Sequence, residues 1–150
     1  IAAVRRTGAG IRLITDGDVA GVIHCADPDN TGVDMYIGTG GAPEGVLAAA
    51  ALRCIGGQMQ GRLLFRNDDE RGRAHRPGIA DLNRKSTMPD MAHGDVMFAA
   101  TGVTDGTMLR GVRRFQDGGT THSMVMRSKT GTVRVIEAQH NFARKPMMEG

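Results

Sequence analysis

The chain has 150 residues, enough for one compact domain and little more. Hydrophobic types make up 40% and charged types 23%, a composition that can bury a core and differs from that of a disordered tail. The longest wholly apolar run, residues 46–52, is far shorter than the ~20 residues that cross a bilayer. The first residues also show no basic segment followed by an apolar one. We therefore expect no membrane association and no secretory signal, and we expect a cytoplasmic protein.

The formal net charge is only +3, and the basic residues are scattered along the chain. With one Tyr and no Trp, the chain offers no aromatic surface on which single-stranded nucleic acid could stack. We expect no nucleic-acid partner, while a small anionic substrate suits this charge equally well. Cys25 and Cys54 stand far apart and outside any Cys-x-x-Cys pair, so we interpret them as small buried residues in a reducing compartment.

Residues 1–6 have the pattern of the last turns of a helix. Arg5 and Arg6 would lie at its negative end, and Gly8 would end it. Because the pattern shows the end of a helix without its beginning, we interpret residues 1–150 as a fragment of a longer chain, with an upstream part missing.

Strands and helices then alternate along the first part of the chain. In order we expect a strand at 11–15, a helix at 19–26, a strand at 33–38, a helix at 43–55 and a strand at 58–64. The second of these helices has Pro in its first turn, Arg in its last turn and two glycines after it, which is typical of a capped helix.

The rest of the chain is richer in strands. We expect a helix at 66–76 closed by Pro77-Gly78, a loop at 81–94, and strands at 96–100, 108–115, 123–127 and 132–138. A turn at residues 128–131 would join the last two strands. The order of elements predicts an α/β fold with a mostly parallel sheet and added antiparallel strands.

The first candidate site is the turn at Asp16, Gly17 and Asp18, which follows the first expected strand. In open parallel sheets, ligands bind at the carboxyl ends of the strands. Two carboxylates across one glycine can accept hydrogen bonds from sugar hydroxyls or help to coordinate a hard cation. From the spacing alone, however, capping of the following helix is the more frequent role of Asp at such a position.

The second candidate site is the loop GTGGAPEG at residues 38–45, which follows the second expected strand. Its glycines allow a ligand to approach the backbone, and the free N–H groups of the next helix would face that ligand. The loop lacks the third glycine of a dinucleotide fingerprint and the Lys-Ser/Thr pair of a P-loop. Glu44 lies in the first helical turn, where the helix dipole stabilises a carboxylate. Beside an anionic ligand Glu44 would be repelled unless a cation lay between them, so it is a candidate metal ligand.

Five sequence strings resemble the class II fructose-1,6-bisphosphatases of the GlpX type and occur in the family's order. They are DGDVAG at 16–21, GGAPEGV at 40–46, MQGRL at 59–63, AATGVTDG at 99–106 and VMRSKTGTVR at 125–134. The resemblance covers nearly the whole chain. It implies the layered helix/sheet domain of the lithium-sensitive sugar phosphatases, with the active site between two domains. By this resemblance, residues 1–150 would form a single α/β domain, a C-terminal fragment of a two-domain phosphatase.

The resemblance also implies an activity and site residues. The activity is metal-dependent hydrolysis of the 1-phosphate of fructose 1,6-bisphosphate in gluconeogenesis, with sedoheptulose 1,7-bisphosphate as a further substrate in some members. Asp16, Gly17, Asp18 and Gly41 would contact the substrate, and Glu44 would bind Mn²⁺ or Mg²⁺. The family's catalytic residues would lie in the missing N-terminal part of the same enzyme, so this fragment would contain none. A homo-oligomer is expected.

One alternative belongs to a different functional class. The chain could be a non-catalytic nucleotide- or sugar-phosphate-binding α/β module that works alone. Ligand affinity of the monomer without a divalent metal would favour this alternative.

Overall fold

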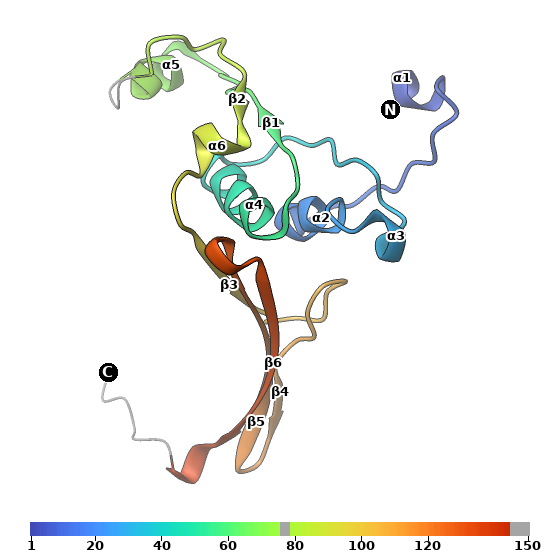
Figure 1. Ribbon diagram of the computed structural model, residues 1–150, viewed down its shortest axis with the longest axis vertical. Coiled ribbons are helices and arrows are strands. Elements are labelled where there is room, and N and C mark those ends of the chain that lie inside the picture. The colour runs from blue at the N-terminus through green and yellow to red at the C-terminus, as the bar shows by residue number, and fades with distance from the viewer. Residues whose placement is uncertain (76–78, 145–150) are drawn as a thin grey trace.

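Helices occupy the first part of the chain and long strands the last part (Figure 1). The computed structural model describes residues 1–75 and 79–144. Its helices are α1 (Ala2–Arg5), α2 (Asp18–His24), α3 (Pro28–Thr31), α4 (Ala42–Ile55), α5 (Asp68–His75) and α6 (Met88–Met91). Its strands are β1 (Gln60–Gly61), β2 (Ser86–Thr87), β3 (Met97–Thr101), β4 (Arg113–Phe115), β5 (Gly118–Arg127) and β6 (Thr132–Asn141). Two short 3-10 turns, η1 (Ser128–Thr130) and η2 (Phe142–Arg144), flank β6.

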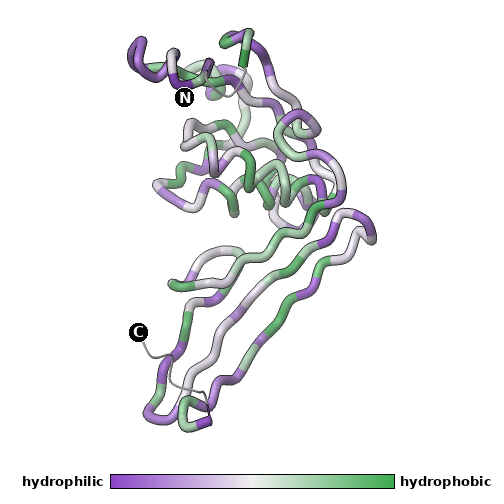
Figure 2. The backbone as a smooth tube through the Cα atoms, turned by 90° about the vertical axis from the view of Figure 1, so that its left-hand side faces the viewer, coloured by the Kyte–Doolittle hydropathy of each residue, from purple (hydrophilic) through white to green (hydrophobic). Residues whose placement is uncertain are grey.

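The main sheet is built around β5. Strand β6 pairs with β5 along its whole length, while β3 and β4 pair with different halves of β5. The β5–β6 hairpin curves away from the helical layer, which Figures 1 and 2 show from two directions. The hairpin turn runs through η1 and ends at Gly131, whose φ of 57° is left-handed and favours glycine. The predicted hairpin with its turn at 128–131 is therefore confirmed, with longer strands than expected.

The expected mostly parallel sheet is wrong for the described part of the chain. Every strand pair there is antiparallel, including the short β1–β2 pair. Residues 11–15 and 33–38, which were expected to be parallel strands, are irregular. The prediction of a mixed helix and strand fold is correct, but its parallel component is not formed.

The physical reason is that a strand needs a partner. No described strand pairs with residues 11–15 or 33–38, and a sheet of these two segments alone would be marginally stable in water. A parallel sheet further requires cover on both faces. Neither condition is met among the described residues.

Helix α4 lies at the centre of the packing. It contacts α2, α6 and β3, and its buried face consists of Ala48, Ala49, Ala51, Leu52 and Cys54. Small alanines let neighbouring elements approach closely. Phe98 and Met126 of the sheet and Ile23 of α2 are buried in one cluster with Ala51 and Cys54 of this helix. The expectation of buried cysteines holds for Cys54, whereas Cys25 is half-buried.

Several boundaries differ from those expected. The strand predicted at 58–64 is reduced to the two residues of β1, and the one predicted at 108–115 to the three residues of β4. The expected loop at 81–94 contains β2 and α6. The predicted helix at 66–76 is present as α5, while its expected stop at Pro77-Gly78 lies outside the described residues. Within the described ranges, no helix is long and apolar enough to cross a membrane.

Candidate functional site

The turn at residues 16–18 opens α2 without a side-chain cap. Gly17 is the N-cap residue, with a left-handed φ of 74°, and no side-chain hydrogen bond caps the helix. Asp18 is the first helical residue, where the positive end of the helix dipole favours its carboxylate. The alternative that Asp16 or Asp18 serves as the N-cap is therefore wrong. Both carboxylates remain available for other contacts.

Asp18 is held by Tyr36. The Tyr36 hydroxyl donates a hydrogen bond of 2.8 Å to Asp18 Oδ1. Burial raises the pKa of the Tyr36 phenol, and the hydrogen bond and negative charge of Asp18 raise it further. The second carboxylate oxygen, Oδ2, faces the glycine loop. Sequence reasoning missed Tyr36 because the contact joins residues 18 positions apart; its place just before the glycine loop was the one available signal.

Glu44 folds back over the start of α4. Its Oε2 accepts a hydrogen bond of 2.6 Å from the backbone N–H of Gly41, the N-cap residue, which gives the reciprocal contact of a capping box. A side chain on Gly41 would collide with this same oxygen. The sequence predicted both the helix start and a dipole partner at Glu44, and the structure adds this contact.

The two carboxylates converge on Gly40. An ideal Cβ built on Gly40 would lie 2.9 Å from Asp18 Oδ2 and 3.9 Å from Glu44 Oε2. Glycine at this position therefore leaves open a space bordered by Asp18 of α2 and Glu44 of α4. The structure brings together Asp18, Gly41 and Glu44, three of the residues expected to form the site.

Asp16 stands apart from this group. Its side chain is exposed and makes no hydrogen bond or ion pair within the described residues. Gly17 contributes the left-handed backbone that turns the chain into α2. The roles expected for Asp16 and Gly17 toward a substrate remain predictions.

The donor set at Gly40 fits a divalent metal only in part. Mg²⁺ and Mn²⁺ prefer carboxylate, carbonyl and water oxygens, usually six in octahedral geometry. Asp18 and Glu44 offer carboxylate oxygens of this kind. No cluster of three or more His, Cys, Asp and Glu side chains that could hold a metal occurs in residues 1–75 and 79–144. These residues could supply part of a metal site, and the remaining ligands would have to come from elsewhere.

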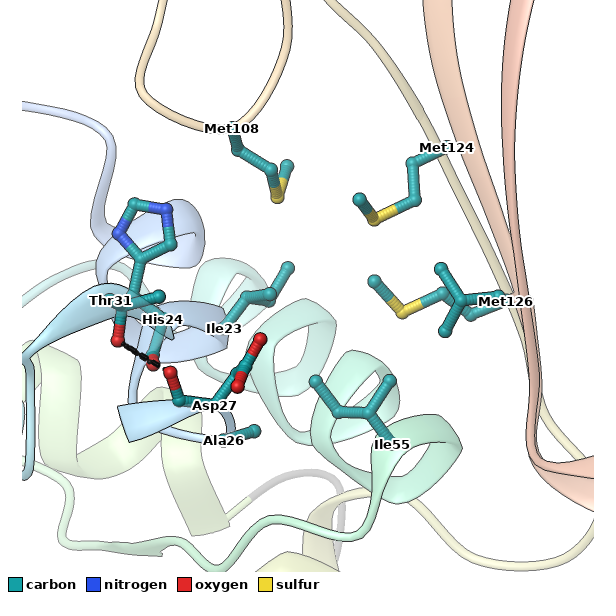
Figure 3. A pocket seen from close by; sticks show the side chains of 10 residues that line it. Ile23, His24, Ala26, Asp27, Thr31, Ile55, Met108, Met124 and Met126 are labelled. Carbon is teal, nitrogen blue, oxygen red and sulfur yellow. Dashed lines mark hydrogen bonds between the residues drawn. The ribbon is translucent and has the colours of Figure 1, made fainter. Parts of the chain in front are cut away.

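An apolar cavity lies away from these carboxylates. It measures about 310 Å³ and lies between the helical layer and the sheet. Figure 3 shows the ends of Met108, Met124 and Met126 directed toward Ile23 and Ile55 of the helices. Such an apolar cavity offers few polar groups to orient a sugar phosphate, so we place the candidate site at Gly40 instead.

A second, smaller cavity on the sheet contains arginines that are already paired. Arg110 forms an ion pair of 2.6 Å with Glu137, and Arg113 one of 2.7 Å with Asp105. The Gly111 N–H and Arg113 together lower the pKa of the Asp105 carboxyl, which is therefore ionised at neutral pH. With their charge compensated, these arginines are poor candidates for a free anion site.

The Tyr36–Asp18 contact gives a prediction that is independent of activity. Since Tyr36 is the only tyrosine and the chain has no Trp, the phenolate absorbance near 295 nm reports on this residue alone. We expect its titration midpoint in the folded chain to lie above that in the urea-unfolded chain. Because the folded chain favours the neutral phenol, Tyr36 adds to the free energy of unfolding at pH values below the pKa of an unfolded tyrosine. This contribution is lost as the pH rises through the raised pKa of the folded chain.

The matched variant is Asp18→Asn, which removes the negative charge and should lower the midpoint of the folded chain. Asp69→Asn, in the first turn of α5, is the control and should leave it unchanged. Equal midpoints for the folded wild-type and Asp18→Asn chains would show that the contact is not made in solution.

Comparison with known proteins adds evidence from sequence. Residues 1–140 match the family model described as bacterial fructose-1,6-bisphosphatase, glpX-encoded. A relative from Trichodesmium erythraeum is 36% identical over 99% of this chain and 47% of its own length. Relatives from a Synechococcus strain and from Microcystis aeruginosa are 39% and 38% identical over 91% and 94% of this chain. All three are named D-fructose 1,6-bisphosphatase class 2/sedoheptulose 1,7-bisphosphatase.

The chain spans a little under half the length of these relatives, between 43% and 47%. It corresponds to their C-terminal part. The family match, in contrast, covers nearly all of this chain and includes the Asp18, Gly40 and Glu44 region. The chain therefore belongs to the glpX-encoded family of bacterial fructose-1,6-bisphosphatases.

Proposed function

We propose that this chain forms the substrate- and metal-binding C-terminal part of a metal-dependent fructose-1,6-bisphosphatase. The supporting observation is the convergence of Asp18 and Glu44 on the open space at Gly40. The relatives' names add fructose 1,6-bisphosphate and sedoheptulose 1,7-bisphosphate as candidate substrates. The proposal includes hydrolysis of the 1-phosphate, a role in gluconeogenesis, and the layered architecture of the lithium-sensitive sugar phosphatases. It also includes a cytoplasmic location and a homo-oligomer.

Each residue has a distinct part in the proposed reaction. Asp18, oriented by the Tyr36 hydroxyl, would accept a hydrogen bond from a sugar hydroxyl through Oδ2, and Asp16 would act similarly from the exposed side of the turn. Gly41 would offer backbone to the substrate. Glu44 would hold a divalent cation, which supplies an activated water and neutralises charge on the phosphate.

The remaining metal ligands and the catalytic groups would come from the part of the family's length that this chain does not span. The experiments below therefore use one polypeptide that contains both parts. This polypeptide, called the joined protein, consists of the unmatched part of the Trichodesmium erythraeum relative followed by residues 1–150 of this chain.

Asn substitutions of the two aspartates test the substrate contact. Asn keeps the shape of Asp and, at position 18, an oxygen that can accept the Tyr36 bond, but it loses the charge. In the joined protein, at least one of Asp16→Asn and Asp18→Asn should lower kcat/KM by roughly ten- to a hundredfold. This range corresponds to the loss of a charge-assisted hydrogen bond of ~1.5–3 kcal/mol.

Asp69→Asn serves as the control and should keep the kcat/KM of the joined protein. The melting temperature should stay nearly constant in all three variants. If both Asp16→Asn and Asp18→Asn retain wild-type kinetics, the proposed substrate contact is wrong.

A further inference from the structure

Three methionine side chains border the apolar cavity between the helical layer and the sheet. Met124 and Met126 stand two positions apart on β5, so both side chains project from the same face of the strand. Met108 comes from the segment that joins β3 to β4. Figure 3 shows the ends of all three side chains directed into the space in front of Ile23. Thioethers from two separate segments thus meet at one cavity.

Two of these thioethers are within reach of solvent. Met108 and Met124 are half-buried, whereas Met126 is only 1% exposed. The cavity of about 310 Å³ also far exceeds the ~30 Å³ that a water molecule occupies in the liquid. A small hydroperoxide such as hydrogen peroxide, which has one oxygen atom more than water, therefore fits beside Met108 and Met124.

The thiols of the chain are less reactive than the thioethers toward such a reagent. Only the thiolate form of cysteine attacks a peroxide readily. Burial raises the pKa of the Cys25 thiol, and the negative charge of Asp34 raises it further. Burial also raises the pKa of the Cys54 thiol. Both thiols are therefore protonated at neutral pH, while a thioether reacts without ionisation.

Helix α2 packs on this group of methionines. Ile23 of α2 and Met126 of β5 are buried in one cluster, and Met108 and Met124 pack against that cluster. The same helix begins at Asp18, whose carboxylate borders the candidate site. The position of this carboxylate therefore depends on apolar packing around the three thioethers.

We propose that Met108 and Met124 form an oxidation site for a small hydroperoxide, and that their oxidation releases α2 from the sheet. The sulfur lone pair attacks one peroxide oxygen, and the O–O bond breaks as the S–O bond forms. The proton of the attacked oxygen passes to the leaving hydroxide, which becomes water. The thioether is thereby oxidised by two electrons to the sulfoxide, and the peroxide is reduced.

The product explains the release. A sulfoxide is polar, and the apolar cavity offers few partners for its oxygen, so the packing of α2 on the sheet is weakened. This inference goes beyond the proposed function, and its test uses no catalytic activity. It therefore stands or falls independently of the hydrolysis of a sugar bisphosphate.

Peptide mapping by mass spectrometry after treatment with hydrogen peroxide tests the site. In this chain, Met108 and Met124 should become sulfoxides within about tenfold of the rate of Met97, which is 70% exposed. The melting temperature should fall by at least about 5 °C as Met108 and Met124 react, but not while only Met97 has reacted. Methionine sulfoxide reductases should restore it, which separates this oxidation from irreversible damage.

The Tyr36 titration reports whether the oxidation reaches the candidate site. After the peroxide is removed, the phenol of the oxidised chain should titrate nearer to the midpoint of the urea-unfolded chain, because Asp18 no longer holds its position beside Tyr36. A lower melting temperature with an unchanged Tyr36 midpoint would contradict the release of α2 and overturn the proposal.

Leucine variants identify the responsible residues. Leu has nearly the volume of Met and resists peroxide, so the double variant Met108→Leu, Met124→Leu should fold and keep its melting temperature within about 2 °C after treatment. Met88→Leu is the matched control, since Met88 is also half-buried but packs against a different buried cluster and does not line this cavity. Peroxide should lower the melting temperature of this control as much as that of the wild type.

Glutamine imitates the polarity of the sulfoxide without peroxide. Met124→Gln should lower the melting temperature of the untreated chain by at least about 5 °C, and Met97→Gln by less than about 2 °C. If Met124→Gln does not fold, the peroxide experiment on the leucine variants still decides. Three results would overturn the proposal: Met108 and Met124 unreacted after Met97 has reacted fully, an unchanged melting temperature after they have reacted, or equal protection by Met88→Leu.

Discussion

This chain alone is expected to release phosphate from fructose 1,6-bisphosphate no faster than buffer with Mg²⁺ or Mn²⁺ does. Its described residues bring two carboxylates to Gly40 and no cluster of three metal-ligating side chains. Magnesium and manganese require more oxygen ligands than this to be held in a fixed geometry. The joined protein, which supplies the unmatched part of the family's length, should hydrolyse the substrate.

A phosphate-release assay on the two proteins, with matched metal and substrate concentrations, measures the difference. The joined protein also serves as the positive control for the assay. If this chain alone turned over substrate within tenfold of the joined protein, the catalytic groups would lie within residues 1–150. The proposal that the site is divided between this chain and the unmatched part of its relatives would then be wrong.

Glu44→Gln is expected to lower the activity of the joined protein by at least about a hundredfold while the fold survives. Gln is the other favoured residue at this position of a capping box, since its amide oxygen can also accept the Gly41 N–H bond. The substitution therefore keeps the cap and removes the charge that a divalent cation needs. The melting temperature should shift by less than about 4 °C, as expected for loss of a dipole interaction worth under about 1 kcal/mol.

Glu137→Gln is the matched control for this experiment. Glu137 lies on β6, where it forms an ion pair with Arg110, and the same chemical change there should keep the rate. The assay is run at limiting metal, where a lost ligand has its largest effect. Normal turnover of Glu44→Gln under this condition would show that Glu44 only caps the start of α4 and binds no catalytic metal.

Local signals explain which elements could be predicted from the sequence. Helix α4 carries its own start and stop: Pro43 and Glu44 in the first turn and Gly56 with a left-handed φ of 92° at its end. The β5–β6 hairpin is also local, because the turn at Gly131 fixes the pairing of two adjacent strands. Such elements depend little on what lies elsewhere in the chain.

The parallel sheet could not be predicted correctly because it depends on partners. Residues 11–15 and 33–38 have the composition of buried strands, yet none of the described strands pairs with them. Sequence reasoning identified their intrinsic preference and could not identify what would pair with them.

The candidate site was predicted in part for a related reason. Asp18 and Glu44 were identified from their sequence strings, but their convergence on Gly40 arises from the packing of α2 against α4. Tyr36, which orients Asp18, could not be assigned from spacing. The capping role considered for Asp16 and Asp18 failed because the left-handed Gly17 takes the N-cap position itself.

The most direct measurement is the Mn²⁺ affinity of the joined protein, determined by calorimetric titration for the wild type, Glu44→Gln and Glu137→Gln. A cation held by the Glu44 carboxylate should bind at least about tenfold more weakly after Glu44→Gln, with the Glu137→Gln control unchanged. Equal Mn²⁺ affinity of Glu44→Gln and the wild type would contradict the metal site proposed at the start of α4.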